Sequence, residues 1–307
     1  MQGLELSRLY FEECGRDVFQ KNFPEIFPRM AFGLAGEGSD CFSFDDEISR
    51  DHDWGAGFCI WLDEPDYTIH GQKIQAVYDA LPQQFHGYPV KKADGAAGGR
   101  IGVLCTQHWY QRYTGCPAGP ETLTQWRAVP EYFLAAVTNG DVFLDMQGHF
   151  SSIRSRLLLY YPEDVRRKKI AYQAAVMAQA GQYNYPRCAK RGDMTAAALA
   201  LWRFLEAGMS MVYLLNKRYA PFYKWMHRGM EKLSILKAGS ALFERLADNG
   251  GADEKTALIE QICGLVGAEL RRQGLSDCQD TFLLSHCADI MHRITDPVLR
   301  QSHIMAP

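Results

Sequence analysis

The segment Gly36-Glu-Gly-Ser-Asp-Cys-Phe-Ser-Phe-Asp-Asp-Glu-Ile-Ser-Arg-Asp-His-Asp-Trp-Gly55 joins two short apolar runs. These runs, residues 30–35 and 57–62, have the length and composition of buried strands. If Asp51 and Asp53 begin an extended strand, the two-residue period points both carboxylates to one face. The segment therefore predicts a strand, a glycine-rich turn and a pair of acids that share one site.

These residue types indicate a metal and a phosphate. Crowded carboxylates repel one another, and a hard divalent cation such as Mg²⁺ stabilises them with oxygen ligands. The backbone N–H groups of the Gly38-Ser39 turn can bind phosphate oxygens, with the Ser39 hydroxyl as a further donor. The alternative is a solvated acidic loop, because the neighbouring residues 45–47 are also acidic.

Outward from this segment, residues 1–149 show a strand and helix pattern. Apolar spacing predicts an amphipathic helix over residues 4–19 and another helix over residues 68–81. Residues 100–106 form a third core strand in this prediction, and residues 142–144 form an edge strand or a tight turn. The region reads as one domain with a sheet.

Residues 150–307 show only helical periodicity, which predicts a second, all-helical domain. Asp193 precedes a good helix-forming sequence and is expected to cap it. The predicted helices cover residues 151–160, 163–180, 194–215, 221–233, 254–273 and 277–294.

The bulk composition narrows the function classes. A net charge of -3 argues against strong non-specific binding to nucleic acid. No apolar run of membrane-spanning length and no signal-peptide pattern occur, so we expect a cytoplasmic protein without a membrane partner. The nine cysteines contain no Cys-x-x-Cys pair. We expect them to serve as small apolar residues and assign none a catalytic role.

Gly38-Ser39, eleven intervening residues and Asp51-His-Asp53 resemble the signature of the DNA polymerase β superfamily of nucleotidyltransferases. Residues 33–61 and 215–225 also resemble the bacterial domain-of-unknown-function 4037 family within that superfamily. The resemblance implies an α+β fold, with an N-terminal nucleotidyltransferase-like mixed sheet with helices followed by a C-terminal helical bundle. The layout is similar to that of aminoglycoside and lincosamide nucleotidyltransferases.

By this resemblance, Gly38 and Ser39 hold a nucleoside triphosphate and Asp51 and Asp53 ligate Mg²⁺. The implied reaction moves a nucleoside monophosphate, AMP from ATP, to a hydroxyl of an unknown small-molecule acceptor. One alternative is transfer to a protein or an RNA. Another is a catalytically reduced module that binds nucleotide without turning it over.

The family pattern adds a third carboxylate from a later core strand, and this sequence departs from it. Residues 100–105 contain no acid. Asp145 is the best substitute by position, and Asp94 and Glu64 are the alternatives. The missing acid is what motivates the binding-module alternative.

Three further groups of residues allow two interpretations each. Lys217, Tyr219 and Lys224 either bind the nucleotide or only place cations near a helix C-terminus. The basic run 166–169 is expected to be a solvated helix face, with a phosphate clamp as the alternative. Trp109, Tyr110 and Tyr113 either line an acceptor pocket or belong to the core.

Overall fold

The computed structural model describes residues 1–51, 54–92 and 99–306. The described chain divides into two compact units, Met1–Leu159 and Tyr160–Pro307. Both the α+β class and a sheet followed by helices agree with the sequence prediction. The division falls at 159/160 rather than 149/150, because helix α7 (His149–Leu158) packs on α6 (Glu131–Thr138) and on β6 (Asp141–Asp145).

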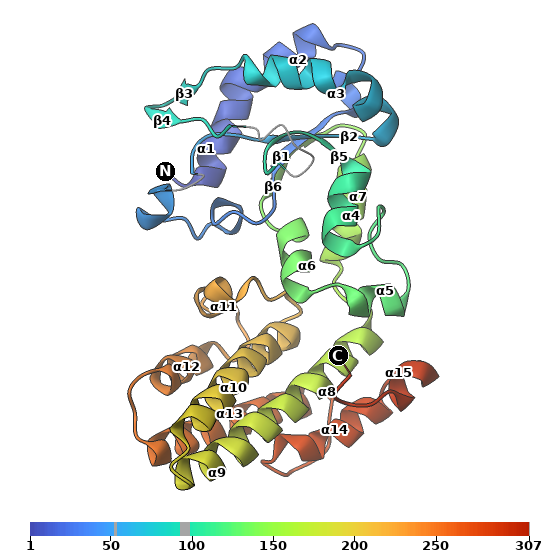
Figure 1. The fold of residues 1–307 in the computed structure, drawn as a ribbon. Helices are drawn as coiled ribbons and strands as arrows, with labels where there is room; N and C mark the ends of the chain where they lie inside the picture. Colours follow the sequence, from blue (N-terminus) through green and yellow to red (C-terminus); the bar gives the residue numbers. More distant parts are fainter. Residues whose placement is uncertain (52–53, 93–98, 307) are drawn as a thin grey trace. The chain divides into compact units, whose positions relative to one another are not determined.

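The first unit begins with three consecutive helical segments and contains two sheets (Figure 1). Its remaining elements are α1 (Gly3–Tyr10), the π-helix η1 (Phe11–Gly15), α2 (Arg16–Asn22), η2 (Phe27–Arg29), β1 (Ala31–Leu34), η3 (Asp40–Phe42), η4 (Ile48–Asp51), β2 (Cys59–Leu62), α3 (Glu64–Asp79), β3 (Gln84–Phe85), β4 (Tyr88–Pro89), β5 (Gly102–Cys105), α4 (Thr106–Thr114) and α5 (Leu123–Ala128).

The main sheet is mixed and has the order β5-β2-β1-β6. Strand β1 is antiparallel to β2 and to β6, whereas β2 is parallel to β5. Gly33 faces Cys59 in the register, and Leu34 faces Asp141. We call this end of the sheet the turn end, because β1 continues from it into the Gly36–Ser39 turn. The opposite end, where Ala31 faces Asp145, is called the far end.

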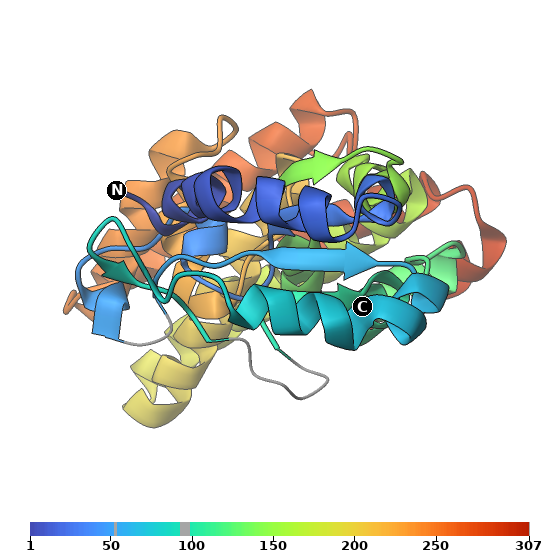
Figure 2. The ribbon, with the colours of Figure 1, turned by 90° about the horizontal axis from the view of Figure 1, so that it is seen from above.

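Alternating side chains cover the two faces of the sheet. Phe32, Ile60 and Leu62 point into a core with the N-terminal helices and α3. Figure 2 looks down on this face, where α1 to α2 in dark blue and α3 in teal lie side by side. On the other face the Trp61 ring stacks on Phe150 of α7 at 3.9 Å between ring centroids. Because side chains alternate along β2, Ile60 and Leu62 pack into one core and Trp61 packs into another.

The second unit is entirely helical in its described residues. Its elements are α8 (Glu163–Met177), the π-helix η5 (Ala178–Asn184), α9 (Tyr185–Lys190), α10 (Met194–Leu215), α11 (Tyr223–Met230), η6 (Lys237–Gly239), α12 (Ser240–Ala247), α13 (Ala252–Arg272), α14 (Leu283–His292) and α15 (Pro297–Gln301). Helix α8 packs on both α10 and α14 at the centre of the bundle. The Asp193 side chain caps α10 through the Ala196 N–H at 3.0 Å, as predicted.

Several predicted elements differ from the structure. The predicted start of the last long helix at residue 277 is wrong, because α14 begins at Leu283 and the Asp280 carboxylate binds the Phe282 N–H before it. Helices α4, α5 and α6 and the hairpin β3–β4 were not predicted. Residues 142–144 form the edge strand β6 rather than a tight turn.

The basic run 166–169 corrects a sequence prediction. Arg166 and Lys168 are 2% and 0% exposed, so this part of α8 is not a solvated face. The Arg166 Nε–H donates to the Leu214 carbonyl at 3.0 Å, and the Lys168 ammonium donates to the His303 carbonyl at 2.6 Å. Both cations donate hydrogen bonds to carbonyl groups at the ends of neighbouring segments. These hydrogen bonds explain why the two side chains can be buried.

Among the described residues, one helix is long and apolar enough to cross a membrane by composition. This helix is α10, and half of its most apolar window is buried. It packs on α8, α9, α11 and α13, as the core helix of a bundle does.

Candidate functional site

A small pocket opens at the turn end of the sheet. It brings together the end of β1, the turn that follows, the residue Lys91 and helix α4. All lining residues belong to the first unit: Leu34, Ala35, Gly36, Glu37, Gly38, Asp40, Cys41, Lys91, Gly99, Arg100, Trp109 and Tyr113.

The loop before β6 holds the turn in place. Asn139 exchanges two hydrogen bonds with Gly36: its Oδ1 accepts from the Gly36 N–H at 2.9 Å, and its Nδ2 donates to the Gly36 carbonyl at 2.6 Å. The Gly140 N–H donates to the Cys41 carbonyl at 2.8 Å. Gly36 has a φ of 129°, which favours glycine. The loop before β6 therefore holds the turn at both of its ends, at Gly36 and at Cys41.

The turn presents a run of backbone donors. In the part of the chain that the structure describes, no protein acceptor binds the N–H groups of Glu37, Ser39 and Asp40, whereas the Gly38 N–H contacts the Cys41 sulfur. Ser39 precedes η3, yet its hydroxyl makes no capping hydrogen bond. Backbone N–H groups of a turn that lack partners can form a concavity that suits an anion. Gly38 and Ser39, predicted to bind phosphate, lie in this run.

A buried ion pair lines the same pocket. The Lys91 ammonium donates to Asp40 Oδ2, and their side chains are 11% and 4% exposed. Asp40 Oδ1 accepts from the Cys41 N–H at 3.0 Å. A Cβ atom on Gly38 would lie 2.1 Å from Asp40 Oδ1, so a glycine at this position leaves room for the carboxylate.

The predicted metal ligands are only partly described. Asp51 is the last residue of the 3-10 helix η4, and β2 starts at Cys59, so Asp51 does not begin a strand. Asp53 and His52 lie outside the described residues, and nothing is described of the Asp51 side chain. Within the described ranges no group of three or more His, Cys, Asp or Glu residues could hold a metal ion. The Asp51 and Asp53 site stays a prediction.

Asp145 does not fit the prediction of a third carboxylate beside the turn. It pairs with Ala31 at the far end of the sheet. Its two oxygens accept from the N–H groups of Gly148 and Ser151, each at 2.8 Å, ahead of and within α7. The antiparallel register of β1 and β6 accounts for this position, because it carries the end of β6 away from the turn.

The alternative acids have different positions. Glu64 starts α3 directly after the far end of β2, and Asp94 lies outside the described residues. Sequence reasoning missed Asp141, which faces Leu34 at the turn end and forms an ion pair with Arg8. Its place directly after Gly140, at the start of a short apolar run, was the available signal.

Trp109 and Tyr113 belong to the core, as one interpretation held, and they also line the pocket. They are 6% and 5% exposed and pack edge to face at 5.1 Å between ring centroids, yet both line the pocket. Burial, with the nearby Glu37 carboxylate, raises the pKa of the Tyr113 hydroxyl. The hydroxyl therefore stays protonated at neutral pH and can donate a hydrogen bond into the pocket.

The two cysteines near the pocket, Cys41 and Cys59, are buried, as predicted. Burial raises the pKa of Cys59 to about 12, and it also raises the pKa of Cys41 well above its ordinary value. Both thiols stay protonated at neutral pH and lack the thiolate that nucleophilic chemistry requires.

Lys217, Tyr219 and Lys224 lie in the second unit, after α10. The Lys217 ammonium lies 3.8 Å from a Glu163 oxygen, and Lys224 lies over the Trp225 ring. The Tyr219 ring packs on Tyr160 at 4.7 Å between centroids. Their predicted role in nucleotide binding stays a prediction.

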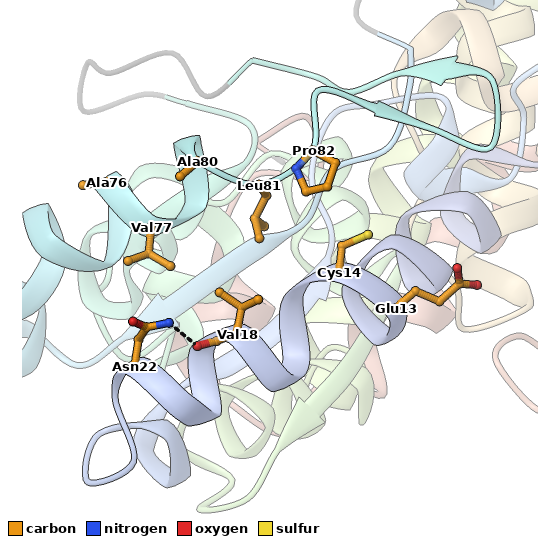
Figure 3. Close-up of a pocket in the computed structure, with 9 residues that line it drawn as sticks. All are labelled: Glu13, Cys14, Val18, Asn22, Ala76, Val77, Ala80, Leu81 and Pro82. Atoms are coloured by element: carbon orange, nitrogen blue, oxygen red, sulfur yellow. Dashed lines mark hydrogen bonds between the residues drawn. The ribbon is translucent and has the colours of Figure 1, made fainter.

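A second hollow lies between η1, α2 and α3, and Figure 3 shows its lining. Val18, Val77 and Leu81 make it largely apolar. The Asn22 amide donates to the Val18 carbonyl at 2.8 Å, and Glu13 lies 3.3 Å from His86. Its polar groups are thus engaged with neighbours, unlike the donors of the turn.

The fold and the pocket define an α+β protein with a glycine-rich turn and a small pocket at one end of a mixed sheet. Residues 126–226 match the family model described as Domain of unknown function (DUF4037), so the predicted resemblance to that family is confirmed over this segment. The matched segment includes Asn139 and Gly140 but not the turn that they hold.

One solved structure is similar in outline: a nucleotidyltransferase-like protein from Exiguobacterium sibiricum 255-15. The match covers 92% of this chain and 90% of that chain, at 10% sequence identity and a TM-score of 0.36. No curated protein matches the sequence.

Proposed function

We propose that this protein is a cytoplasmic nucleotidyltransferase that moves a nucleoside monophosphate from a nucleoside triphosphate, ATP in the first instance, to a hydroxyl of a small molecule. The observation that carries the proposal is the set of N–H groups of Glu37, Ser39 and Asp40, which have no acceptor in the described chain and border a pocket that contains Lys91. Such a site suits the phosphate groups of a nucleotide.

The proposed reaction is an in-line displacement at the α-phosphorus. An oxygen of the acceptor hydroxyl forms the new bond to phosphorus, the bond to the bridging oxygen breaks, and pyrophosphate leaves with that electron pair. The hydroxyl proton passes to solvent or to a nearby base. The turn at Gly38 and Ser39 holds the phosphate groups in position, and positioning is a large part of catalysis for this chemistry.

Asp51 and Asp53 are the residues that would hold Mg²⁺. When bound beside the phosphates, the ion supplies neutralisation of the charge that develops on the leaving group. Trp109 and Tyr113 contribute aromatic rings to the lining of the pocket and are suited to contact a base or an acceptor.

A second candidate is a module that binds nucleotide without turnover. The position of Asp145 and Glu64 at the far end favours it, because neither can complete a carboxylate site beside the turn. The two candidates agree on the phosphate site and differ only in whether pyrophosphate is released.

The deciding experiment measures nucleotide binding with and without Mg²⁺, followed by pyrophosphate release with a panel of small hydroxylated acceptors. Wild type is compared with Asp51→Ala/Asp53→Ala. Glu47→Ala, an exposed acid in the same segment, is the matched control. Metal-dependent binding with pyrophosphate release, both lost only in the double variant, supports the transferase. Binding without release supports the module, and absence of nucleotide binding in wild type refutes both.

A further inference from the structure

The Asp40–Lys91 pair is unusual for its burial. Both side chains are about nine-tenths buried, and both line the pocket beside the donors of the turn. Taking two charges out of water costs free energy, and apolar residues of similar size often give equal or greater stability. The pair is therefore poorly explained by stability alone, and its position in the pocket points to a ligand.

The backbone around Lys91 is fixed independently of its side chain. The Lys91 N–H donates to the Ala56 carbonyl at 2.8 Å, and the Ala56 N–H donates to the Pro89 carbonyl at 3.0 Å. Val90 and Ala56 form a parallel bridge. The hairpin β3–β4 thus delivers Lys91 to the segment before β2, where its ammonium reaches across to Asp40.

Asp40 is held just as firmly from its own side. Gly3 and Gly38 both crowd it: a Cβ atom on Gly3 would lie 2.7 Å from Asp40 Cβ, and one on Gly38 would lie 2.1 Å from Oδ1. One carboxylate oxygen accepts from the Cys41 N–H and the other from Lys91. The carboxylate is oriented toward the ammonium and cannot rotate freely.

The hydrogen-bonding capacity of the ammonium exceeds what Asp40 uses. A lysine ammonium has three donors, and a single carboxylate oxygen accepts one of them. The adjacent backbone donors of Glu37, Ser39 and Asp40 are also without a protein acceptor in the described chain. A phosphate group has enough oxygens to accept from both sets at once.

We propose that Lys91 is the cation that binds the phosphate chain of the ligand and that Asp40 is a positioning residue that holds the Lys91 ammonium in the pocket. This inference rests on the proposed function, which it extends by naming the recognised chemistry: a polyphosphate rather than a base or a sugar. In the absence of ligand, Asp40 neutralises Lys91. On binding, the ammonium keeps its contact with Asp40 and donates its remaining protons to phosphate oxygens, screening the ligand from the carboxylate.

The test measures the affinity of ATP, inorganic tripolyphosphate and adenosine by calorimetry for wild type and for Lys91→Met. We expect wild type to bind ATP and tripolyphosphate, and Lys91→Met to bind both about 10- to 100-fold more weakly, as for loss of a hydrogen bond from a charged donor. Lys92→Met removes the same charge from the adjacent exposed lysine and is expected to leave all affinities within about twofold of wild type.

Two further variants keep the test decisive if Lys91→Met folds poorly with Asp40 left unpaired. Asp40→Asn/Lys91→Met removes both charges and is expected to fold and to show the same loss of phosphate affinity. Lys91→Arg keeps the charge and is expected to retain most of the phosphate affinity. Equal ATP affinity in wild type and in the folded double variant overturns the role of Lys91 and leaves the proposed function standing. Failure of wild type to bind ATP or tripolyphosphate overturns both.

Discussion

The two ends of the main sheet use their polar groups in opposite ways. At the far end, the Asp145 carboxylate is occupied by two backbone N–H groups of the segment that begins α7, and Asp63 contacts His149. At the turn end, the backbone donors of Glu37, Ser39 and Asp40 have no protein acceptor among the described residues, and an ion pair is buried next to them.

This difference in hydrogen bonding indicates that a ligand binds at the turn end rather than at the far end. A carboxylate that already accepts well-aligned hydrogen bonds stabilises the fold and has little capacity left for a metal or a substrate. Donors that the fold leaves unpaired at a pocket can be satisfied by a ligand. An acid near a strand end is thus weak support for a site until its hydrogen bonds are known.

The largest expected effect is on the rate of pyrophosphate release, which should differ strongly between variants at the two ends of the sheet. Asp51→Ala/Asp53→Ala is expected to lower the rate of pyrophosphate release by at least about a thousandfold, because charge stabilisation worth several kcal/mol is lost. Asp145→Asn, at the far end, is expected to lower it by less than about tenfold. A steady-state assay measures both. A loss in Asp145→Asn as large as that of the double variant would break the comparison.

A large effect on stability is expected at the turn end. Asp40→Ala leaves the Lys91 ammonium buried without its partner, which typically costs about 3–5 kcal/mol in the free energy of unfolding. Urea denaturation followed by tryptophan fluorescence measures the change. Asp40→Asn/Lys91→Met serves as the control and should recover most of the loss. Equal destabilisation in both variants would show that lost packing, not an unpaired charge, is responsible.

A smaller loss is expected at the far end. Asp145→Ala removes the acceptor for the Gly148 and Ser151 N–H groups, and loss of a cap of this kind costs about 1–2 kcal/mol. The same denaturation experiment detects it. Tripolyphosphate affinity should stay as in wild type, since the site lies at the other end of the sheet. Reduced affinity at unchanged stability would contradict this assignment.

The smallest effect concerns Asp164 in the second unit. Like Asp145, its carboxylate accepts hydrogen bonds from backbone N–H groups. Burial raises its pKa, but hydrogen bonds from the Thr295 side chain and from the Asp296 and Thr295 N–H groups outweigh burial and lower the pKa overall. A lowered folded-state pKa gives stability that is present above the unfolded pKa of about 3.9 and is lost as the pH falls through the folded-state pKa.

The measurement for Asp164 is hydrogen exchange of the Thr295 and Asp296 amides between pH 3 and pH 6, expressed as protection factors. Wild type should lose protection toward the acid end of this range. Asp164→Asn should show lower protection with no such pH dependence. An identical pH profile in both proteins would show that another group controls this turn.

The sequence predicted the core of the first unit well, because its signals are local. The apolar runs 30–35 and 57–62 became β1 and β2, and the apolar spacing of residues 4–19 became the helices that cover them. The helix Met194–Leu215 has the predicted bounds, since Asp193 caps its start. Each of these elements is specified by periodicity or by a cap within one stretch of chain.

Helix α4 shows where local signals failed. Its sequence follows β5 without a glycine or proline, and its buried face, which includes Trp109 and Tyr110, is matched to Trp61 and Phe150 from distant segments. The basic run on α8 was misjudged for a related reason. Only packing against other helices brings carbonyl acceptors such as that of Leu214 to Arg166.

By itself, the sequence determined the α+β class, the position of the glycine-rich turn after the first strand and the residue types that suit phosphate and metal chemistry. Tertiary structure decided which of those residues share a site. It brought Lys91 to Asp40 and Asn139 to Gly36, and it carried Asp145 to the opposite end of the sheet. Strand direction and register set these pairings, and both depend on contacts between residues far apart in the chain, which no local pattern records.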